Sequence, residues 1–520
     1  MWISCFLLLL LPSIYHAWWF AAEAVPFLVT GVIVCAVLVS MVMWLPWRVS
    51  RWFVFTMLFV VTLFELAHMM VYDGDIASAG YVRSLFMTTP YEADGALGRV
   101  IKQHIGFIAF VAVFYLWDSV LLFVARPQKQ WTLWISTVAG ILLVVQVIVN
   151  TAALFNRPPL NIYVQMVEAW HQRCQRNELT SQPSNFSYHA GRHCAPTQKE
   201  VYLLVLDESL RYDHVSLDST NYRQTMPRME KLNNLVVYAD YYTTGVFTMY
   251  AVPMLITRAT PTTVALSYTE PGVQQAFYEA GFKTIWLTNE AQLVSDGVSD
   301  YVARGAEIIR VPNDMSMPAV VDSLCETADK LFMVLHLWGN HQFYLNTDAS
   351  TSRYYPDITT TDDVHGEQMY NNAYDNAILY TDSMLLELTE VLNSKSCIAQ
   401  WIFTSDHGEG PIGRNGGAHG YTLPSSGEYH VPLLIWYNDE YAAAFPDKVA
   451  NMRKHCAHPL CADHMFWSML DMADIRIDST LQQEDMSIYG DSLMPHQRVL
   501  LLPDGKNTKF VEEINGDRYQ

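Results

Sequence analysis

The sequence predicts an N-terminal bundle of about five membrane-spanning helices, followed by a soluble α/β domain with a central, mostly parallel sheet flanked by helices. Residues 1–155 are almost continuously apolar, whereas residues 199–520 have the mixed composition of a soluble domain. Residues 156–198 are largely polar and include Pro158–Pro159, so we expect them to connect the two parts. In the soluble part, short apolar runs alternate with helical stretches, a pattern typical of a parallel sheet wrapped by helices.

The N-terminal part contains about five apolar runs that are long enough to cross a bilayer, for which a helix needs about 20 residues. The first run has no positively charged start, so we interpret it as a span and not as a cleavable signal peptide. The five expected spans are Trp2 to Ala22, Pro26 to Leu45, Trp52 to Val71, Ile105 to Val124 and Trp131 to Leu154.

Positive charges in the short loops between these spans predict how the chain is oriented. Arg48 and Arg51 lie between the second and third spans, and Arg126 and Lys129 lie between the fourth and fifth. Because Lys and Arg favour the cytoplasmic side of a membrane, we expect the N-terminus in the cytoplasm and everything after the fifth span outside it. The formal net charge of -20 argues against a nucleic-acid partner, which requires a basic surface.

Most of the cysteines follow the last span, on the oxidising side of the membrane. An even number of cysteines there predicts disulfides, with free buried thiols as the alternative. The six residues allow many connectivities, so the pairing is open. Proximity along the chain favours Cys174–Cys194 and Cys456–Cys461, which leaves Cys325–Cys397.

The soluble part contains several apolar segments that predict buried strands, alternating with amphipathic segments that predict helices. In such sheets, active groups gather beyond the carboxyl ends of the strands. The expected strands are Val201–Leu206, Thr284–Leu287, Leu331–Leu337, Ile402–Thr404 and Val431–Trp436. The expected helices are Gly272–Ala280, Pro318–Ala328, Asn371–Leu392 and His464–Ala473.

Four polar segments stand out as candidates for the chemistry, and three of them follow a predicted strand. One apolar run ends in Asp207–Ser209, and another is followed by Gly339–His341. A third ends in Ser405-Asp-His-Gly-Glu409, which is followed by Ala418-His-Gly420. The fourth segment, Gly245–Pro253, has the composition of a turn that enters a helix. Recurrence of such segments at strand ends predicts one shared site.

These residue types suit a catalytic metal ion. Carboxylate and imidazole ligands without thiolates are typical of a catalytic zinc with an open position for substrate. A bound dication lowers the pKa of a hydroxyl as it does that of water, which explains how Thr248 becomes a nucleophile. A covalent phospho-threonine splits one transfer into two steps. Taken singly, a Thr beside Gly is usually a turn residue and a buried His is usually hydrogen-bonded.

With these motifs the sequence resembles the phosphoethanolamine transferases of the alkaline phosphatase and sulfatase superfamily, which include lipid A modifiers and the mobile colistin-resistance enzymes. The resemblance covers nearly the whole chain and implies an alkaline-phosphatase-like fold for the soluble domain. The Tyr-Asp-Asn and Tyr-Thr-Asp residues of one helix are specific to that family. The matching residues are Glu208, Thr248–Pro253, Gly339–His341, Tyr374–Asp382, Ser405–Glu409, Ala418–Gly420 and His430–Pro432.

The resemblance also implies an activity and a location. Phosphatidylethanolamine would transfer its phosphoethanolamine to Thr248 and release diacylglycerol, and lipid A or another envelope glycan would then accept the group. His341 and His419 would bind the transferred group or a second zinc ion and help proton transfer, so the number of zinc ions is open. The protein would be a monomer in the bacterial inner membrane with its catalytic domain in the periplasm. The implied zinc ligands are Glu208, Thr248, Asp406 and His407.

Two further carboxylates are candidates for additional metal contacts. Asp207 replaces the Gly that commonly precedes the glutamate in that family, and it either contacts the metal or orders Arg211. Glu409, at the end of the Ser-Asp-His-Gly-Glu motif, is the second candidate.

Other departures from the family pattern leave the acceptor open. Ala251 and Met254 replace the usual Ser and Cys, and Gln342–Phe343 replaces the usual Gly-Pro. If lipid A is the acceptor, the added amine offsets phosphate charge and reduces the binding of cationic peptides such as polymyxin. Three alternatives are a phosphoglycerol transferase, a sulfatase-like hydrolase and a non-catalytic membrane protein that retains the fold. Sulfatases use a modified Cys or Ser as nucleophile, and neither occupies position 248.

Overall fold

The protein is described from a computed structural model. Two compact units account for the chain, one within Met1–Leu85 and Pro90–Arg173, and the other within Cys174–Thr361 and His365–Gln520. The structure describes residues 1–22, 24–86, 90–124, 129–181, 186–192, 195–217, 223–289, 302–341, 344, 350–358, 366–410, 412, 418–422 and 425–514.

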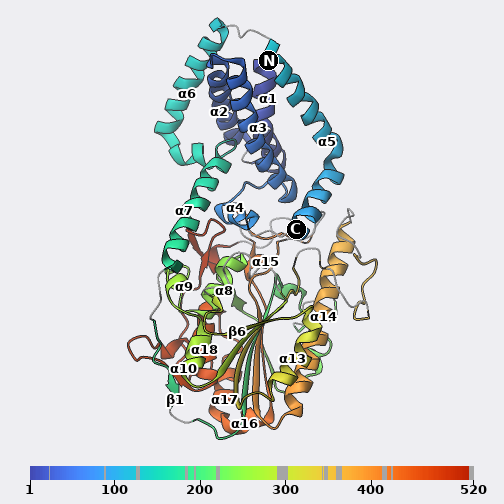
Figure 1. Ribbon diagram of the computed structural model, residues 1–520, viewed down its shortest axis with the longest axis vertical. Coiled ribbons are helices and arrows are strands. Elements are labelled where there is room, and N and C mark those ends of the chain that lie inside the picture. The colour runs from blue at the N-terminus through green and yellow to red at the C-terminus, as the bar shows by residue number, and fades with distance from the viewer. Residues whose placement is uncertain are drawn as a thin grey trace. The chain divides into compact units, whose positions relative to one another are not determined.

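The first unit is a helical bundle (Figure 1, blue to cyan). Its helices are α1 (Trp2–Trp19), α2 (Ala24–Trp44), α3 (Arg48–Val71), α4 (Ala79–Leu85), α5 (Pro90–Val124) and α6 (Lys129–Phe155), and α7 (Asn161–Ser181) follows them. Among the described residues, five helical segments are long and apolar enough to cross a membrane, which confirms the expected number of spans. These segments are Trp2–Trp19, Ala24–Trp44, Arg48–Val71, Val100–Val124 and Gln130–Thr151.

Polar groups in this bundle find partners within it. Glu65 on α3 is buried, and the side-chain amide of Asn161 donates to its Oε1 at 3.2 Å and to the carbonyl of Ala77 at 2.9 Å. The ring of His68 stacks on Tyr72 with centroids 4.2 Å apart and lies 4.1 Å from the ring of Tyr81. Because an ionisable group within a span is costly unless it is paired, the contact with Asn161 favours burial of Glu65, whereas His68 is held by ring packing.

A seven-stranded sheet forms the centre of the second unit (Figure 1). Five neighbouring strands are parallel, and β9 runs antiparallel to both of its neighbours, so the sheet is mostly parallel as expected. In spatial order the strands are β3 (Leu235–Tyr238), β9 (Leu433–Tyr437), β8 (Ile398–Ser405), β2 (Glu200–Asp207), β7 (Lys330–His336), β5 (Lys283–Thr288) and β6 (Glu307–Arg310).

Helices cover both faces of this sheet, which is why β2 and β8 are buried along their whole length. On one face, α13 (Met317–Leu324) and α14 (Glu367–Ser394) contribute to a single apolar core with the strands (Figure 1). On the other face lie α8 (Thr248–Ile256), α10 (Val273–Glu279) and α18 (Met465–Met472), and Phe277 of α10 stacks on Phe332 of β7 at 3.9 Å. The predicted α/β architecture is therefore confirmed.

Among its described residues, the second unit also contains three small two-stranded sheets and several short helices. The pair most relevant to the site is β4 (Tyr241–Tyr242) with β10 (Leu460–Cys461), which are parallel. The other two pairs are β1 (Gly191–Arg192) with β11 (Ile475–Arg476), and β12 (Val499–Leu501) with β13 (Thr508–Phe510). Within the described residues, the unit also contains α9 (Leu266–Thr269), α15 (Ser426–Tyr429), α16 (Asp439–Ala444) and α17 (Pro446–Lys454).

The two predicted disulfides that fall on described residues, Cys325–Cys397 and Cys456–Cys461, are not formed. Cys325 and Cys397 are free thiols within the apolar core, where a thiol packs as a small hydrophobic group. Cys461 is a buried thiol in β10, whereas Cys456 lies in the partly exposed turn after α17, so the two occupy different environments. The third predicted pair includes Cys194, which lies outside the described residues, and its partner Cys174 is an exposed free thiol.

Candidate active site

The two central carboxylates of the site come from the ends of adjacent strands. β2 ends at Asp207 and β8 ends at Ser405, and these residues are paired in the sheet. Glu208 and Asp406 therefore follow at the same edge. Ser209 adopts the left-handed conformation with φ of 58°, and its backbone N–H donates to Oδ1 of Asp406 at 3.3 Å. This sharp turn holds Glu208 against Asp406.

Glu208, Asp406 and His407 form a buried group that fits a metal ion. One ligand atom from each lies within 4.8 Å of the others, and none of the three residues is more than 1% exposed. Nε2 of His407 lies 3.1 Å from Oε1 of Glu208 and 3.4 Å from Oδ2 of Asp406. Within the described residues, Nε2 of His407 and Oδ2 of Asp406 have no hydrogen-bond partner.

The tautomer of His407 also suits a metal ligand. Its Nδ1 lies 2.9 Å from the carbonyl oxygen of Gly408, so an Nδ1–H group donates there and Nε2 keeps its lone pair. Metal-bound histidines are usually oriented by such a hydrogen bond from the other ring nitrogen. In the form that binds a metal, with both carboxylates ionised and the imidazole neutral, a divalent cation would neutralise the buried negative charge in place of protons.

The protonation equilibria reflect this crowding of charge. Burial raises the pKa of Asp406 well above its usual range, and the charge of Glu208 raises it further. Burial opposes ionisation of Glu208 too, but the neighbouring His407 outweighs it and lowers the pKa of Glu208 well below its usual range. Although burial alone lowers the pKa of His407, the charges of Asp406 and Glu208 raise it to about 10. The group thus attracts positive charge strongly.

Thr248 lies at the start of α8 and contacts this group. Its hydroxyl donates to Oε2 of Glu208 at 3.2 Å. Thr248 is partly exposed, whereas every other residue of α8 is buried, so its hydroxyl is open to a reactant. The N-terminus of a helix stabilises negative charge, which favours both a deprotonated hydroxyl and a bound phosphate there. The hydroxyl of Thr243 donates to the carbonyl oxygen of Asp406 and ties the preceding loop to the site.

His341 and His419, the two further histidines expected in the site, lie beside the metal-ligand group. The ring of His419 lies 4.1 Å from the ring of His407. The ring of His341 packs on Trp338 with centroids 4.4 Å apart. Both histidines contribute to lowering the pKa of Glu208, after the larger contribution of His407. The structure therefore brings together Thr248, the expected ligands and both histidines.

Asp207 and Glu409, the two carboxylates considered as additional ligands, do not belong to the ligand group. Oδ1 of Asp207 accepts the backbone N–H of Glu208 at 3.0 Å, and burial raises the pKa of Asp207 well above its usual range. Oε1 of Glu409 lies 3.5 Å from Nδ1 of His419, and orients that ring. The carboxylate of Asp207 supports the turn at Glu208, and a metal contact of Asp207 stays a prediction.

Glu428 is a buried residue that sequence reasoning missed. Its carboxylate accepts the backbone N–H groups of Gly420 at 2.6 Å, Tyr421 at 3.2 Å and Ser425 at 2.9 Å. It thereby fixes the loop that presents His419. The Ser-x-x-Glu spacing of Ser425 and Glu428 is the signature of a capping box at the start of α15 and was available in the sequence. The hydrogen bonds from Gly420 and Tyr421 to Glu428 could not be predicted from the sequence.

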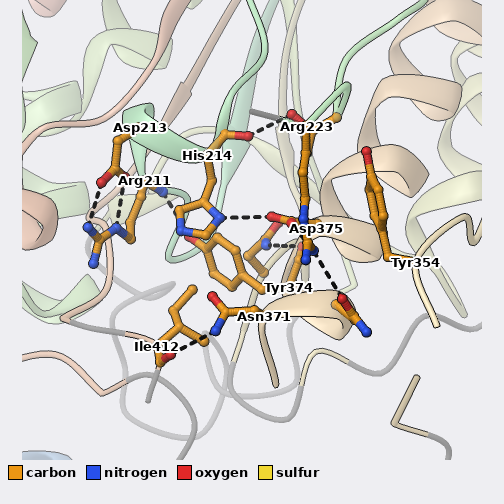
Figure 2. Close-up of polar contacts among 12 residues, drawn as sticks. Arg211, Asp213, His214, Arg223, Tyr354, Asn371, Tyr374, Asp375 and Ile412 are labelled. Carbon is orange, nitrogen blue, oxygen red and sulfur yellow. Dashed lines mark hydrogen bonds and ion pairs between the residues drawn. The ribbon is translucent and has the colours of Figure 1, made fainter. Parts of the chain in front are cut away.

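Tyr374 and Asp375 of the Tyr-Asp-Asn motif in α14 contact the segment that follows Glu208 (Figure 2). The Tyr374 hydroxyl accepts the backbone N–H of Arg211 at 2.8 Å and donates to the carbonyl of Ser209 at 2.6 Å. Asp375 next to it pairs with Nδ1 of His214 at 2.8 Å and with the guanidinium of Arg223 at 2.7 Å. Both interactions hold the segment that follows Glu208.

Arg211 connects this segment to the other half of the site (Figure 2). Its guanidinium pairs with both carboxylate oxygens of Asp213, at 2.8 Å and 2.6 Å. Its Nη1 donates to the carbonyls of Glu409 at 3.2 Å and Gly410 at 2.9 Å. Since a planar guanidinium donates in several fixed directions, Arg211 fixes the backbone that carries Glu409, the partner of His419.

Comparison with known proteins agrees with this architecture. The putative transferase YhbX of Escherichia coli K12 is 28% identical over 247 residues, which are 46% of this chain and 43% of YhbX. The chain thus matches less than half the length of that relative. The solved membrane protein lipooligosaccharide phosphoethanolamine transferase A (EptA) of Neisseria meningitidis has a TM-score of 0.74 at 17% identity, over 93% of this chain and 97% of EptA. That likeness shows the same fold over both units.

A third neighbour was solved with zinc. The C-terminal periplasmic domain of EptC from Escherichia coli, in complex with Zn, has a TM-score of 0.55 at 19% identity, over 62% of this chain and 96% of that domain. These neighbours show that the chain has the fold of solved proteins named phosphoethanolamine transferases. The family model described as Sulfatase matches residues 200–475, which include β2, α8, β7 and β8. Because that match covers more than half of the chain, the protein belongs to the sulfatase family, within the alkaline phosphatase and sulfatase superfamily.

Proposed function

We propose that the protein is a zinc-dependent phosphoethanolamine transferase that uses Thr248 as its nucleophile. The observation that supports this most directly is the contact between the Thr248 hydroxyl and Glu208, at 3.2 Å, beside a buried group of metal-ligand type. The membrane-spanning helices and the neighbours named as phosphoethanolamine transferases support a lipid as the donor. We also propose phosphoethanolamine as the transferred head group and lipid A or another envelope glycan as the acceptor.

Glu208, Asp406 and His407 would hold the zinc ion, and Thr248 would complete its ligands. When bound, zinc lowers the pKa of a coordinated hydroxyl and neutralises charge on phosphate oxygens. The donor set of oxygen and imidazole nitrogen without thiolate agrees with a catalytic zinc. We propose one zinc ion at the group of Glu208, Asp406 and His407, and metal analysis of the protein would count any second ion at His341 and His419.

In the proposed first step, Oγ1 of Thr248 attacks the phosphorus of phosphatidylethanolamine. The new bond joins that oxygen to phosphorus, the bond from phosphorus to the glycerol oxygen breaks, and diacylglycerol leaves with a proton. In the second step, an oxygen of the acceptor attacks the phospho-threonine and Thr248 regains its proton. His419 and His341 would transfer these protons, and their position beside the ligand group supports this role. The helix N-terminus at Thr248 stabilises the phosphate charge.

The proposed setting is the bacterial inner membrane, with residues 1–155 spanning it, residues 156–198 connecting, and residues 199–520 as a monomeric catalytic domain in the periplasm. The Lys and Arg residues in the short loops favour this orientation. The acceptor would be lipid A or another envelope glycan, which such a domain meets on the outer face of the membrane.

A phosphoglycerol transferase or a sulfatase-like hydrolase on the same fold would share the ligand group. The hydrolase is less favoured because position 248 is Thr and not a Cys or Ser of the type that sulfatases modify. Phosphoglycerol transfer differs only in the donor head group.

The test is to incubate the purified full-length protein in detergent with phosphatidylethanolamine labelled in its ethanolamine. We expect one labelled group on Thr248, found by peptide mass spectrometry, together with released diacylglycerol. Phosphatidylglycerol labelled in its head group is the competing donor, and it should leave the protein unlabelled. Chelation followed by return of zinc should abolish and then restore labelling. Label from phosphatidylglycerol alone would replace the proposed donor, and label on the Thr248→Ala variant would reject the mechanism.

The acceptor requires a second measurement. Envelope glycolipids from cells that express the active protein are compared by mass spectrometry with those from cells that express Thr248→Ala. A gain of one phosphoethanolamine on lipid A is the expected result, accompanied by reduced binding of polymyxin. A gain on another glycan would retain the transferase and change the acceptor.

A further inference from the structure

A second group of ligand-type residues lies in the soluble unit, apart from the catalytic group. Asp463 and His464 belong to the 3-10 turn Ala462–His464 that follows β10, and His496 lies in the segment that leads into β12. One ligand atom from each of the three lies within 4.8 Å of the others. Neither the ligands named above nor the proposed mechanism includes them, and His496 lies beyond residues 200–475, the part that the family model matches.

The contacts among these three residues are close. Nε2 of His496 lies 3.0 Å from Oδ2 of Asp463, and Nδ1 of His464 lies 3.3 Å from Oδ1 of the same carboxylate. The two imidazole rings are 4.4 Å apart between centroids. A carboxylate thus stands between two imidazoles, in an arrangement of donor atoms that suits zinc.

Each of the three residues also has a buried polar atom without a hydrogen-bond partner among the described residues: Oδ1 of Asp463, Nε2 of His464 and Nδ1 of His496. His464 is the most telling of them because it is fully buried. Its Nδ1 lies 3.0 Å from the carbonyl oxygen of Cys461 and 3.2 Å from the backbone nitrogen of the same residue, while its Nε2 has no hydrogen-bond partner among the described residues. A buried ring nitrogen without a partner is costly unless a ligand uses it. A backbone carbonyl that orients one ring nitrogen is the usual partner of a metal-bound histidine.

From these contacts we propose that Asp463, His464 and His496 form a second zinc site, apart from the catalytic group. Zinc bonds of about 2.0–2.2 Å to nitrogen and oxygen place tetrahedral ligand atoms roughly 3.3–3.6 Å apart. The three ligand atoms, within 4.8 Å of one another, reach that spacing by small side-chain movements. A water molecule would be the fourth ligand, because the side chain of His496 is 28% exposed and leaves the site accessible.

The elements joined by this site support the segment that carries the nucleophile. β10, which ends at Cys461, pairs with β4, and β4 leads directly into the loop before Thr248. On the side of His496, β12 follows within a few residues, and the backbone N–H of Leu501 in β12 donates to the carbonyl of Thr244 in that same loop at 2.8 Å. Helix α8 also packs against the 3-10 turn that contains Asp463 and His464. A zinc ion here would fix the two chain segments that hold this loop from opposite sides.

The site is tested by counting zinc in a background that lacks the catalytic ligands. Full-length protein with Asp406→Ala and His407→Ala is purified in detergent, stripped with a chelator, equilibrated with zinc chloride and desalted. Metal per chain is then measured by plasma mass spectrometry. We expect close to one zinc per chain in this background and almost none after His496→Gln is added. His458→Gln is the matched control, because His458 lies near in sequence but outside the group, and it should retain the zinc.

A second measurement guards against loss of folding in these variants. In the otherwise unchanged protein, Asp463→Asn retains the size of the side chain but removes its charge. We expect tetrahedral cobalt absorption to decrease by about half relative to wild type after cobalt exchange, with the circular dichroism unchanged. A background variant that folds but holds no zinc, or a zinc count unchanged by His496→Gln, would overturn the site. The background protein lacks Asp406 and His407, so its zinc count does not depend on whether the proposed transferase activity is correct.

Discussion

The hydroxyl of Thr248 donates to one oxygen of Glu208 at 3.2 Å, while the other oxygen of that carboxylate lies 3.1 Å from Nε2 of His407. Glu208 therefore joins the nucleophile to the ligand group. Thr248 is the most exposed member of this arrangement, and three buried ligands remain when it is changed. A substitution of Thr248 should thus remove the proposed nucleophile without removing the metal ion.

This separation predicts different results for two substitutions of the nucleophile. Thr248→Ala should lower the turnover rate by about 10⁴-fold or more, since a missing nucleophile leaves only binding and electrostatic contributions. Thr248→Ser retains a hydroxyl at the helix N-terminus and should retain measurable turnover. Both variants should hold the zinc of the catalytic group. The measurements are diacylglycerol release and metal analysis, and loss of zinc from Thr248→Ala would show that the other three ligands are insufficient.

Gly339, in the turn that leads to His341, is predicted to tolerate no side chain. Its φ is 52°, and a Cβ there would lie 1.7 Å from Oδ1 of Asp207. Gly339→Ala should destabilise the soluble unit by about 2–4 kcal/mol, the sum of overpacking and backbone strain. Gly281→Ala is the control, because Gly281 has φ of 88° but open space around the added carbon. It should cost only about 1 kcal/mol. Equal losses of melting temperature in the two variants would contradict the contact with Asp207.

Arg211 is predicted to be a positioning residue for the His419 side of the site. Arg211→Lys removes the paired bonds to Asp213 and at least one bond to the Glu409 or Gly410 carbonyl, since an ammonium cannot reproduce the planar fork. We expect a loss of about 2 kcal/mol of stability and a kcat about 10-fold lower, with KM little changed and zinc retained.

The control for this variant is Arg223→Lys, which changes another arginine of the same network (Figure 2). Arg223 is 38% exposed and contacts Asp375, whose other partner His214 remains. We expect near-normal kcat in that variant. A kcat lowered equally by both substitutions would indicate a general loss of packing and not a specific role of Arg211.

Glu428 is predicted to make stability dependent on pH. Burial raises the pKa of Glu428 to about 8, above the ordinary value of 4.5. The contribution of Glu428 to the free energy of unfolding is therefore complete below about pH 4.5. It declines as pH rises, because Glu428 ionises in the unfolded chain while it stays protonated in the folded one. The decline is about 1.4 kcal/mol per pH unit and ends near pH 8.

Glu428→Gln removes this titration while retaining a carbonyl oxygen as acceptor. The melting temperature of the variant relative to wild type should therefore rise between pH 5 and pH 8. Glu326→Gln is the control, since Glu326 is an exposed carboxylate that pairs with Lys395. A difference between variant and wild type that is constant over this range would show that Glu428 is ionised throughout.

Much of the fold could be predicted because the buried strands are continuous apolar segments. Val201–Leu206 and Ile402–Thr404 both fall within observed central strands, and each is followed by the expected carboxylate. A strand covered on both faces has no polar alternation, so composition alone identifies it. The edge strands β3 and β6 were missed because they are short and partly exposed, with a weaker apolar signal.

The features that could not be predicted depend on contacts between segments that are distant in the sequence. Glu428 reads as an ordinary helix cap, and only the fold places its oxygens at the loop of His419. Cys325 and Cys397 were paired by elimination, whereas both remain thiols in the core. His496 belongs to no motif, and its neighbours lie some 30 positions earlier, so no local pattern could indicate it.

The adjacency of β2 and β8 has a consequence for biosynthesis. Glu208 and Asp406 are encoded far apart, so a nascent chain that has emerged only as far as β7 contains the nucleophile and one carboxylate but no place for the ion. The centre of the sheet closes only when β8 inserts beside β2. If the proposed mechanism holds, prematurely terminated chains that lack β8 lack two of the three buried ligands and should transfer no group from a lipid.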